Sequence, residues 1–510
     1  MSVTPVSAPR KVDLLLRHAY VITMDDEDTR YPDGAVAIDK GLIVEVGADQ
    51  DLARAYRAAD VIDAAGAPVH PGLIETHLHA SYHTFRGALP DHLPEHLAFD
   101  SFESVFYNKV TSNDEYLSVA LAAIEMIRNG TTCFMEAGTI LDPDAAASAA
   151  EHVGIRAVLG DTIIWDQPNG LAQGDELVQN APDSEGNTRP RIARAPQSLD
   201  EALAGLGRQL ERNSDADALV TGHVAVLGLG TASEDLMMAA KEVADRGRTV
   251  VNIHQSYSPA DVKADRDRFG RDPLVHLADI GFLDSNVTLG HGNLLTDAEC
   301  EALLHTGATI AWAPAASMMW GHGSCFDGRH AELYRRGANI ALGSDSPNWS
   351  NSFDLFRQAS FAVLTAREAH LDREYLVAED GLYMATRGGA RAVGMQDRLG
   401  SIEAGKRADI VVHTLRRPEL IPTTDLLRNL MYSAGSKSVD TVIVNGKVIL
   451  RNSGFTTIDE AGLLRDVQSA SDALLTRMGR APEPNHRRLR PPSPGDPGAR
   501  GDSSGRGRRP

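Results

Sequence analysis

The chain has 510 residues, and its 42% hydrophobic content is that of a globular protein with a large core. Its formal charge is −20, and residues 482–510 hold seven arginines against three acidic residues, so residues 1–481 carry −24. A body this acidic repels nucleic acid and anionic membranes, and we expect neither as a partner. Three widely spaced cysteines, no apolar leader and no run of 18 apolar residues predict a cytoplasmic protein.

Short strands are predicted near both ends of the chain. "DLLLRHAYVIT" and "GAVAIDKGLIVEVG" follow a flexible N-terminus (1–12), and "ADIVVH" and "DTVIVNGKVIL" come shortly before residue 455. Each is an apolar, β-branched run bounded by turn residues. We therefore predict one small β-sandwich domain built from residues 13–66 and 400–455.

Between these segments, strand-like and helix-like stretches alternate eight times. The strand candidates are "GLIETHLH", "TTCFMEAG", "IRAVLGDTI", "ALVTGHVAVLG", "TVVNIHQS", "NVTLGHGN", "TIAWAPAAS" and "NIALGSDSP". Stretches such as 114–130 and 233–247 have apolar residues three and four apart and end at a glycine, as helices do. Eight such units predict a (β/α)8 barrel over residues 67–399.

Three further segments complete the predicted organisation. Residues 80–112 and 166–215 are long connections, which at the mouth of a barrel usually shape the substrate pocket. Residues 456–481 are predicted to be helical. Residues 482–510 are rich in proline, glycine and arginine and have almost nothing apolar to bury, so we expect a disordered tail.

Five polar residues fall where predicted barrel strands end, and these ends meet at one mouth. The residues are His77 and His79 after the first strand, His254 after the fifth, His291 after the sixth and Asp345 after the eighth. In a strand, alternate side chains share a face, so His77 and His79 point to the same side. Imidazoles with a carboxylate and no cysteine suit Zn, Fe, Co or Mn in a catalytic site.

Several motifs, taken in order, resemble one enzyme family. They are "PGLIETHLH", "GTT", "GHGN", "LGSD" and the closing run "MATRGGARAVGMQDRLGSIEAGKRADIVVH" (384–413). Together they are similar to the metal-dependent amidohydrolase superfamily, in the branch of cytosine and guanine deaminases and triazine hydrolases. The resemblance covers roughly residues 13–455. It implies a barrel flanked by a β-sandwich, a homo-oligomer, and hydrolysis of a non-peptide carbon–nitrogen bond in a small molecule.

The resemblance also implies roles for single residues. His77, His79, His254 and Asp345 would bind one divalent metal ion, zinc first among the candidates, and His291 would lie beside the attacking water or the substrate. A divalent ion lowers the pKa of its bound water toward about 7. Asp345 would then accept the water proton and pass it to the leaving nitrogen, while His291 orients the nucleophile and stabilises charge.

One position departs from the family pattern. The branch usually has His-x-x-Glu at the fifth strand, where the glutamate protonates a ring nitrogen, but this chain has Tyr257 there. A tyrosine, with a pKa of about 10, cannot shuttle protons as a carboxylate does. Glu136 and Asp161 are the nearest substitutes by position. An amide, urea or carbamate group needs less help from an acid, so we expect a substrate of that type or an amino-substituted one.

The residues predicted to contact the substrate are Tyr257, Gln255, His223 and Glu136. Three alternatives to the preferred function stay open: an aminoheterocycle deaminase, a ring-closing cyclodehydratase that uses the same polarised carbonyl, and a barrel that binds metal or ligand without turnover. The sequence does not predict the substrate itself, because the long connections that would select it contain no motif.

Overall fold

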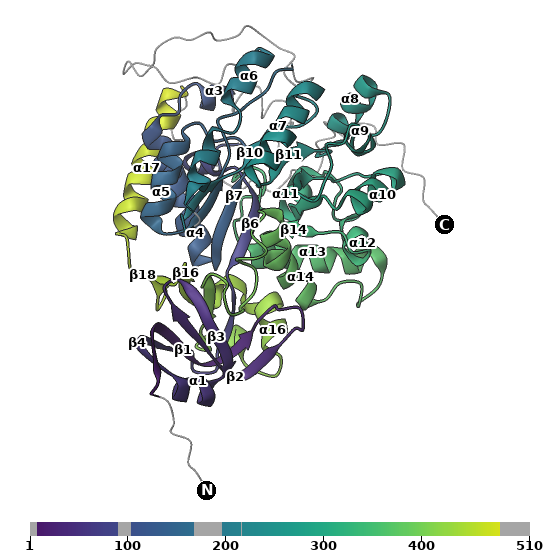
Figure 1. Cartoon of the computed structure of the whole chain (residues 1–510). Coiled ribbons are helices and arrows are strands. Elements are labelled where there is room, and N and C mark those ends of the chain that lie inside the picture. Colours follow the sequence, from purple (N-terminus) through teal and green to yellow (C-terminus); the bar gives the residue numbers. More distant parts are fainter. Residues whose placement is uncertain (1–7, 90–103, 168–195, 216, 480–510) are drawn as a thin grey trace, which may run out of the picture.

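The computed structural model describes residues 8–89, 104–167, 196–215 and 217–479. Figure 1 shows a barrel surrounded by helices, with strands from both ends of the chain lying together at the bottom of the view.

Eight strand positions build the barrel. They are β6 (Leu73–Leu78), β7 (Thr131–Glu136), β8 (Arg156–Leu159), β9 (Val220–Gly222) continued by β10 (Val224–Ala225), β11 (Val251–Gln255), β12 (Val287–His291), β13 (Thr309–Trp312) and β14 (Ile340–Leu342). Neighbouring strands pair in parallel throughout. Nearly every residue in them is buried, as expected for parallel strands covered on both faces.

The barrel closes at two irregular points. His223 separates β9, which pairs with β8, from β10, which pairs with β11. On the other side, an isolated parallel bridge joins Leu78 to Asp345, and the Asp345 N–H donates to the carbonyl of His77 at 2.8 Å. The predicted (β/α)8 barrel is confirmed.

Helices cover the outside of the barrel. They are α4 (Ser112–Arg128), α5 (Pro143–Val153), α6 (Leu199–Gly205), α7 (Glu234–Gly247), α8 (Pro259–Phe269), α9 (Pro273–Asp279), α10 (Asp297–Thr306), α11 (Pro314–Trp320), α12 (His330–Arg335), α13 (Leu355–His370), α14 (Ala378–Ala385) and α15 (Arg387–Ala392). Side-chain caps begin several of them: the Thr111 hydroxyl accepts from Asp114 N at α4, and the Ser233 hydroxyl accepts from Leu236 N at α7. Gly247, the expected helix stop, is the last residue of α7. Arg248, the residue after it, adopts the left-handed conformation that ends the helix.

Strands from the two ends of the chain form one nine-stranded sheet. They are β1 (Arg10–Ile22), β2 (Arg30–Asp39), β3 (Leu42–Ala48), β4 (Tyr56–Asp63), β5 (Pro68–Pro71), β15 (Ile410–His413), β16 (Val439–Val444), β17 (Lys447–Arg451) and β18 (Gly454–Phe455), with α1 (Asp49–Ala55) between β3 and β4. The order is β18-β17-β16-β15-β5-β1-β2-β3, and β4 pairs with β1. Side chains of β1, β2, β15 and β16 share one apolar cluster, so the sheet folds over a common core.

Three predicted boundaries need correction. The N-terminus was expected to be flexible to residue 12, but Arg10–Val12 already pair with Tyr56–Ala58. The barrel was expected to begin at 67, but β5 pairs with β1 and β15, because a continuous ladder satisfies its backbone groups. Residues 418–438 leave the sheet and pack their leucines into the barrel's main apolar cluster, as η4 (Pro418–Leu420), α16 (Leu426–Asn429), η5 (Leu430–Ala434) and η6 (Gly435–Ser438).

The last described helix is α17 (Glu460–Arg477), which packs against α4 and adds Leu463, Val467 and Ala470 to the apolar cluster there. Three short elements remain: η1 (Ala80–Phe85), α3 (Ser104–Tyr107) and η3 (Arg208–Ser214). The predicted tail (482–510), residues 90–103 of the first long connection and residues 168–195 of the second lie outside the described residues. Among the residues that the structure describes, no helix is long and apolar enough to cross a membrane.

Candidate metal centre and active site

The structure brings the five predicted mouth residues into one cluster. His77 and His79 come from the end of β6, His254 from β11, His291 from the last position of β12, and Asp345 from the residues after β14. The Nε2 atoms of His254 and His79 lie 3.2 Å apart, and the Nε2 of His79 lies 3.3 Å from Oδ1 of Asp345. The ring of His77 is 4.7 Å, centre to centre, from the rings of both His254 and His291.

Two glycines make room for His77 at the centre of the barrel. A Cβ on Gly290 would lie 2.5 Å from Cε1 of His77, and a Cβ on Gly343 would lie 2.6 Å from its Cβ. Any side chain at either position would displace the imidazole. The glycines of "GHGN" and "LGSD" therefore belong to the site, although neither offers a functional group.

Two members of the cluster have unusual backbone conformations. His291 and Asp345 have φ of +81° and +66°, in the left-handed region that residues other than glycine rarely adopt. His291 is the last residue of β12, and Asp345 lies in the turn that follows β14. Strained backbone of this kind concentrates at functional sites, where the surrounding contacts hold it in place.

Several buried polar atoms of the cluster have no hydrogen-bond partner among the described residues. They are both ring nitrogens of His77, Nδ1 of His254 and Oδ2 of Asp345. Burial without a partner is costly for each of them, and a bound cation removes much of that cost. In addition, 3.2 and 3.3 Å match the spacing of about 3.3 Å between two ligands of a tetrahedral ion with bonds of about 2.0 Å. The residues present fit a divalent metal ion.

The protonation states of the cluster suit metal ligands. Burial and the neighbouring histidines hold the pKa values of His77 and His254 well below the ordinary value, so both rings are neutral. Burial alone would raise the pKa of Asp345, but contact with His79 and the other histidines outweighs it and lowers that pKa. Neutral imidazoles and an ionised carboxylate are the forms that bind metals.

A hydrogen-bond relay orients His79. Its Nδ1 lies 2.8 Å from the hydroxyl of Thr139, and that hydroxyl donates to Oε1 of Glu136 at 2.7 Å. The Thr139 oxygen therefore accepts from Nδ1–H, which leaves a lone pair on Nε2, facing the cluster. Outer partners of this kind fix the tautomer and direction of a ligating histidine.

Glu136, which the sequence predicts to contact the substrate, is part of this relay. Its carboxylate also accepts from the N–H groups of Gly138 and Thr139, at 2.7 and 3.0 Å, so its oxygens are engaged within its own turn. Burial raises the pKa of Glu136, and these donors oppose the rise. Asp161 is the other residue predicted to replace the family's strand-five glutamate. Its carboxylate accepts hydrogen bonds from Gly207 N and Gln209 N and stabilises the turn that contains them.

Gln255 and His223, also predicted to contact the substrate, make their hydrogen bonds to other parts of the barrel. The side-chain amide of Gln255 donates to Asp265 of α8 at 2.6 Å, because strand alternation places residue 255 opposite His254. Both ring nitrogens of His223 lie within hydrogen-bond distance of backbone carbonyls, those of Glu136 (2.8 Å) and Val224 (3.1 Å). His223 thus ties β7 to the break between β9 and β10.

Tyr257 does lie beside the cluster. Its ring is 5.9 Å from that of His291 and 6.2 Å from that of His322. Its backbone is fixed on both sides, since Tyr257 N donates to Asp261 and the Asn293 amide donates to the Tyr257 carbonyl at 2.7 Å. The residue that departs from the family pattern is therefore held next to the chemistry.

Sequence reasoning missed the residues that support the cluster from behind. Glu75, two residues before His77, is buried and accepts from His77 N and Ser344 N, which joins β6 to the end of β14. Burial raises its pKa to about 7. Thr139 and His330, which contacts His291, are the others. Strand alternation places Glu75 on the same face as His77 and His79, whereas no sequence signal marks Thr139 or His330, because each contacts a partner on a different element.

Comparisons with known proteins agree with this geometry. The model of the amidohydrolase family matches residues 69–449. A 5-methylthioadenosine/S-adenosylhomocysteine deaminase from Syntrophobacter fumaroxidans is 33% identical over 88% of this chain and 95% of its own. An adenosine deaminase from Xanthomonas campestris, solved with bound zinc, is 27% identical, covers 92% of this chain and all of its own, and superposes with a TM-score of 0.81.

An atrazine chlorohydrolase from Arthrobacter aurescens, solved with zinc, has the same fold at 22% identity and a TM-score of 0.76, over 90% of this chain and all of its own. The resemblance read from the motifs is confirmed. The cluster could hold a divalent metal ion, and the related adenosine deaminase was solved with one. The chain belongs to the amidohydrolase family and is a hydrolase that acts on carbon–nitrogen bonds other than peptide bonds.

Proposed function

We propose that His77, His79, His254 and Asp345 bind a single zinc ion and that the enzyme hydrolyses an amide-, urea- or carbamate-type bond of a small molecule. The ligand set supports zinc because imidazole nitrogens and a carboxylate oxygen are ordinary zinc ligands. A related adenosine deaminase was solved with zinc. Iron, cobalt and manganese accept the same ligands and are the alternatives to test.

When bound, the metal supplies a water molecule activated for attack and polarises the attacked carbon. Asp345 is the general base in this proposal. Its Oδ1 accepts from Ser346 N at 2.7 Å, whereas its Oδ2 has no partner among the described residues, so one oxygen is anchored and the other can take a proton. The same oxygen then returns the proton to the leaving nitrogen.

His291 is the second catalytic group. Its ring lies 4.7 Å from that of His77 and 5.9 Å from that of Tyr257, between the ligands and the substituted position. From there an imidazole can donate a hydrogen bond to the attacked group as negative charge develops on it. Tyr257 adds a neutral donor on the same side.

The observation that carries the choice of substrate is that neither of the described carboxylates offered by the sequence as a second acid is free to serve the cluster. Among the described residues, Glu136 is engaged by Thr139 and Gly138, Asp161 by a distant turn, and residue 257 is a tyrosine. Protonating an aromatic ring nitrogen at neutral pH calls for such a group, whereas an amide, urea or carbamate carbon is electrophilic without it. Asp345 can carry the proton in that reaction.

A second candidate is hydrolytic deamination of an amino-substituted heterocycle. The names of two relatives favour it, since one is a 5-methylthioadenosine/S-adenosylhomocysteine deaminase and the other an adenosine deaminase. In this case Tyr257 would have to support the ring nitrogen as a hydrogen-bond donor only.

The test compares the two substrate classes on zinc-loaded enzyme. One panel holds simple amides, ureas and carbamates, and the other holds adenosine, 5-methylthioadenosine and S-adenosylhomocysteine; released amine or ammonia and product mass are measured. The Asp345→Asn variant is the control for turnover at this site. We expect product from the first panel. Faster product from the second establishes the deaminase instead, and no product from either rejects both candidates.

The homo-oligomer and the cytoplasmic location stay predictions. Light scattering coupled to size-exclusion chromatography tests the first, and fractionation of cells that express the chain tests the second.

A further inference from the structure

His330, the first residue of α12, is a buried histidine to which the proposed chemistry gives no role. Its side chain is 1% exposed, and its Nε2 lies 2.7 Å from the carbonyl oxygen of His291. A carbonyl can only accept, so Nε2 carries the hydrogen and donates it. The contact is therefore a directed bond from a helix on the outside of the barrel to the backbone of a catalytic residue.

The His330 hydrogen bond holds the His291 carbonyl at a position where strand pairing has already ended. The ladder between β12 and β13 ends at the pair Gly290–Ala311. At His291 the chain turns into the left-handed region, with φ of +81°. On the far side of the turn, the N–H groups of Gly292 and Asn293 donate to carbonyls at the end of β11. The His330 side chain thus fixes the side of the turn that faces β13.

His330 is itself held firmly. Its ring stacks on that of Trp312, the last residue of β13, with centres 4.7 Å apart and planes at 16°. The indole N–H of Trp312 donates to the hydroxyl of Ser324 at 3.0 Å. The donor therefore has little freedom to turn away from the carbonyl.

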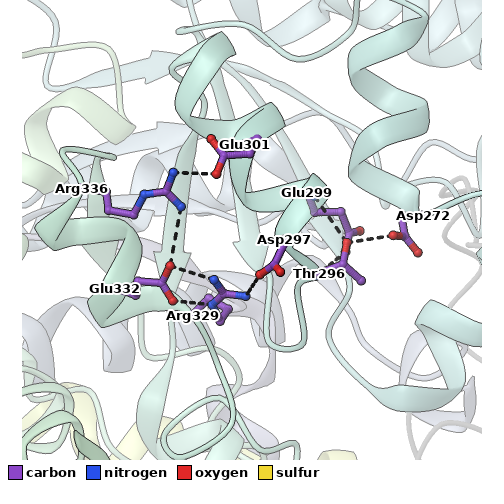
Figure 2. Close-up of polar contacts among 8 residues, drawn as sticks. All are labelled: Asp272, Thr296, Asp297, Glu299, Glu301, Arg329, Glu332 and Arg336. Carbon is purple, nitrogen blue, oxygen red and sulfur yellow. Dashed lines mark hydrogen bonds and ion pairs between the residues drawn. The ribbon is translucent and has the colours of Figure 1, made fainter.

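The helix that carries His330 is tied to the helix that follows β12. Arg329 donates to Asp297 at the start of α10 and to Glu332 of α12, and Arg336 joins Glu301 of α10 (Figure 2). Because α10 follows β12 after a short loop, these ion pairs hold α12 in register with the end of that strand.

We propose that His330 is a positioning residue for His291: its Nε2–H bond holds the left-handed backbone that aims the His291 imidazole into the cluster. The inference rests on the catalytic role of His291 in the proposed function. It assigns no metal contact to His330, so metal binding should not depend on it.

Three variants test the role. His330→Leu keeps the bulk and loses the donor, His330→Gln keeps an N–H donor near the place of Nε2, and His276→Leu removes a buried histidine that contacts Glu234 on the outer helices. We expect His330→Leu to lower kcat about 10- to 100-fold, the usual effect of removing an outer-shell partner, with little change in KM. His330→Gln should recover most of the rate, His276→Leu should keep it, and all three should bind a full equivalent of zinc.

A readout that needs no substrate separates this inference from the proposed function. The crystal structure of His330→Leu should show His291 out of the left-handed region, with its ring turned from the cluster. If the parent hydrolyses none of the substrates, that structure still decides the positioning role. An unchanged His291 in the leucine variant overturns the inference, as does a leucine variant with parental kcat or a glutamine variant as slow as the leucine one.

Discussion

His79 and His254 are 175 residues apart in the sequence, yet their Nε2 atoms face each other at 3.2 Å across the barrel mouth. The Thr139 hydroxyl accepts a hydrogen bond from Nδ1–H of His79, so the nitrogen that faces His254 carries a lone pair. Without a cation, two ring nitrogens at this spacing repel each other through their lone pairs. A shared cation binds both lone pairs and removes the repulsion. The pair is thus the part of the site most sensitive to how His79 is oriented.

Removing the hydroxyl that orients His79 should weaken metal binding. Thr139→Val keeps the shape of the side chain but frees Nδ1 of His79, and we expect zinc affinity to fall about 10- to 100-fold. Competition with a chromogenic chelator measures it. Thr139→Ser, which keeps a hydroxyl, should stay near the parent. Equal affinity in all three proteins would show that the relay does not orient the ligand.

Filling the space beside His77 should also expel the metal. In Gly290→Ala the new Cβ would lie 2.5 Å from the His77 ring, so the imidazole must move, at a cost of about 1–3 kcal/mol in unfolding free energy. Metal content should drop while the circular dichroism spectrum persists. Gly205→Ala is the matched control, because no atom lies within 3.6 Å of the Cβ built there. Full metal occupancy in Gly290→Ala would show that metal binding does not require the space beside His77.

Asp345→Asn should separate binding from turnover. An amide oxygen can still ligate, but the side chain cannot accept a proton, so much of the zinc should remain while kcat falls about 100- to 10,000-fold. Elemental analysis and steady-state kinetics on the same preparation give both numbers. Activity within a few-fold of the parent would remove Asp345 from the role of base.

Tyr257→Phe distinguishes the two substrate classes. If the phenol only donates a hydrogen bond, its loss should cost about 0.5–3 kcal/mol of transition-state stabilisation, and the pH–rate profile should keep its shape. If the enzyme deaminates a ring and needs the phenol as its acid, ring turnover should vanish together with the high-pH limb. Rapid deamination of adenine, guanine or cytosine by the parent would contradict the preference for an acyclic group.

A buried pair of histidines between the sheet and the barrel should make stability depend on pH. His70 and His413 meet through their Nε2 atoms at 2.8 Å, and burial lowers the pKa of His70 to about 4. The unfolded chain then binds more protons than the folded one between pH 6.5 and 4, so the stability due to the neutral pair is complete above about 6.5 and is lost as the pH falls toward 4.

The measurement is urea unfolding of the parent and of the double variant His70→Leu, His413→Leu over this pH range. The difference in unfolding free energy between the two proteins should shrink by about 3 kcal/mol on acidification. A difference that stays constant with pH would show that the pair does not titrate in this window.

The barrel was readable from the sequence because its signals are local. Each strand holds a short apolar run such as "IAL" of β14, and the capping residues Thr111 and Ser233 stand where their helices begin. The five mouth residues could also be read, because strands of a parallel barrel end at one mouth, so position along a strand is enough to group them. The ligand spacing could not be read in this way.

Only the tertiary structure decided which neighbours each side chain has. Glu136 and Gln255 stand at strand ends like the ligands, yet one carboxylate is engaged by the turn that follows it and one amide by helix α8. Thr139 and His330 have no motif, and they matter because their partners, His79 and His291, come from other strands. Local pattern determines strands and helices, since period and propensity act over a few residues, but hydrogen bonds between distant elements depend on how those elements pack.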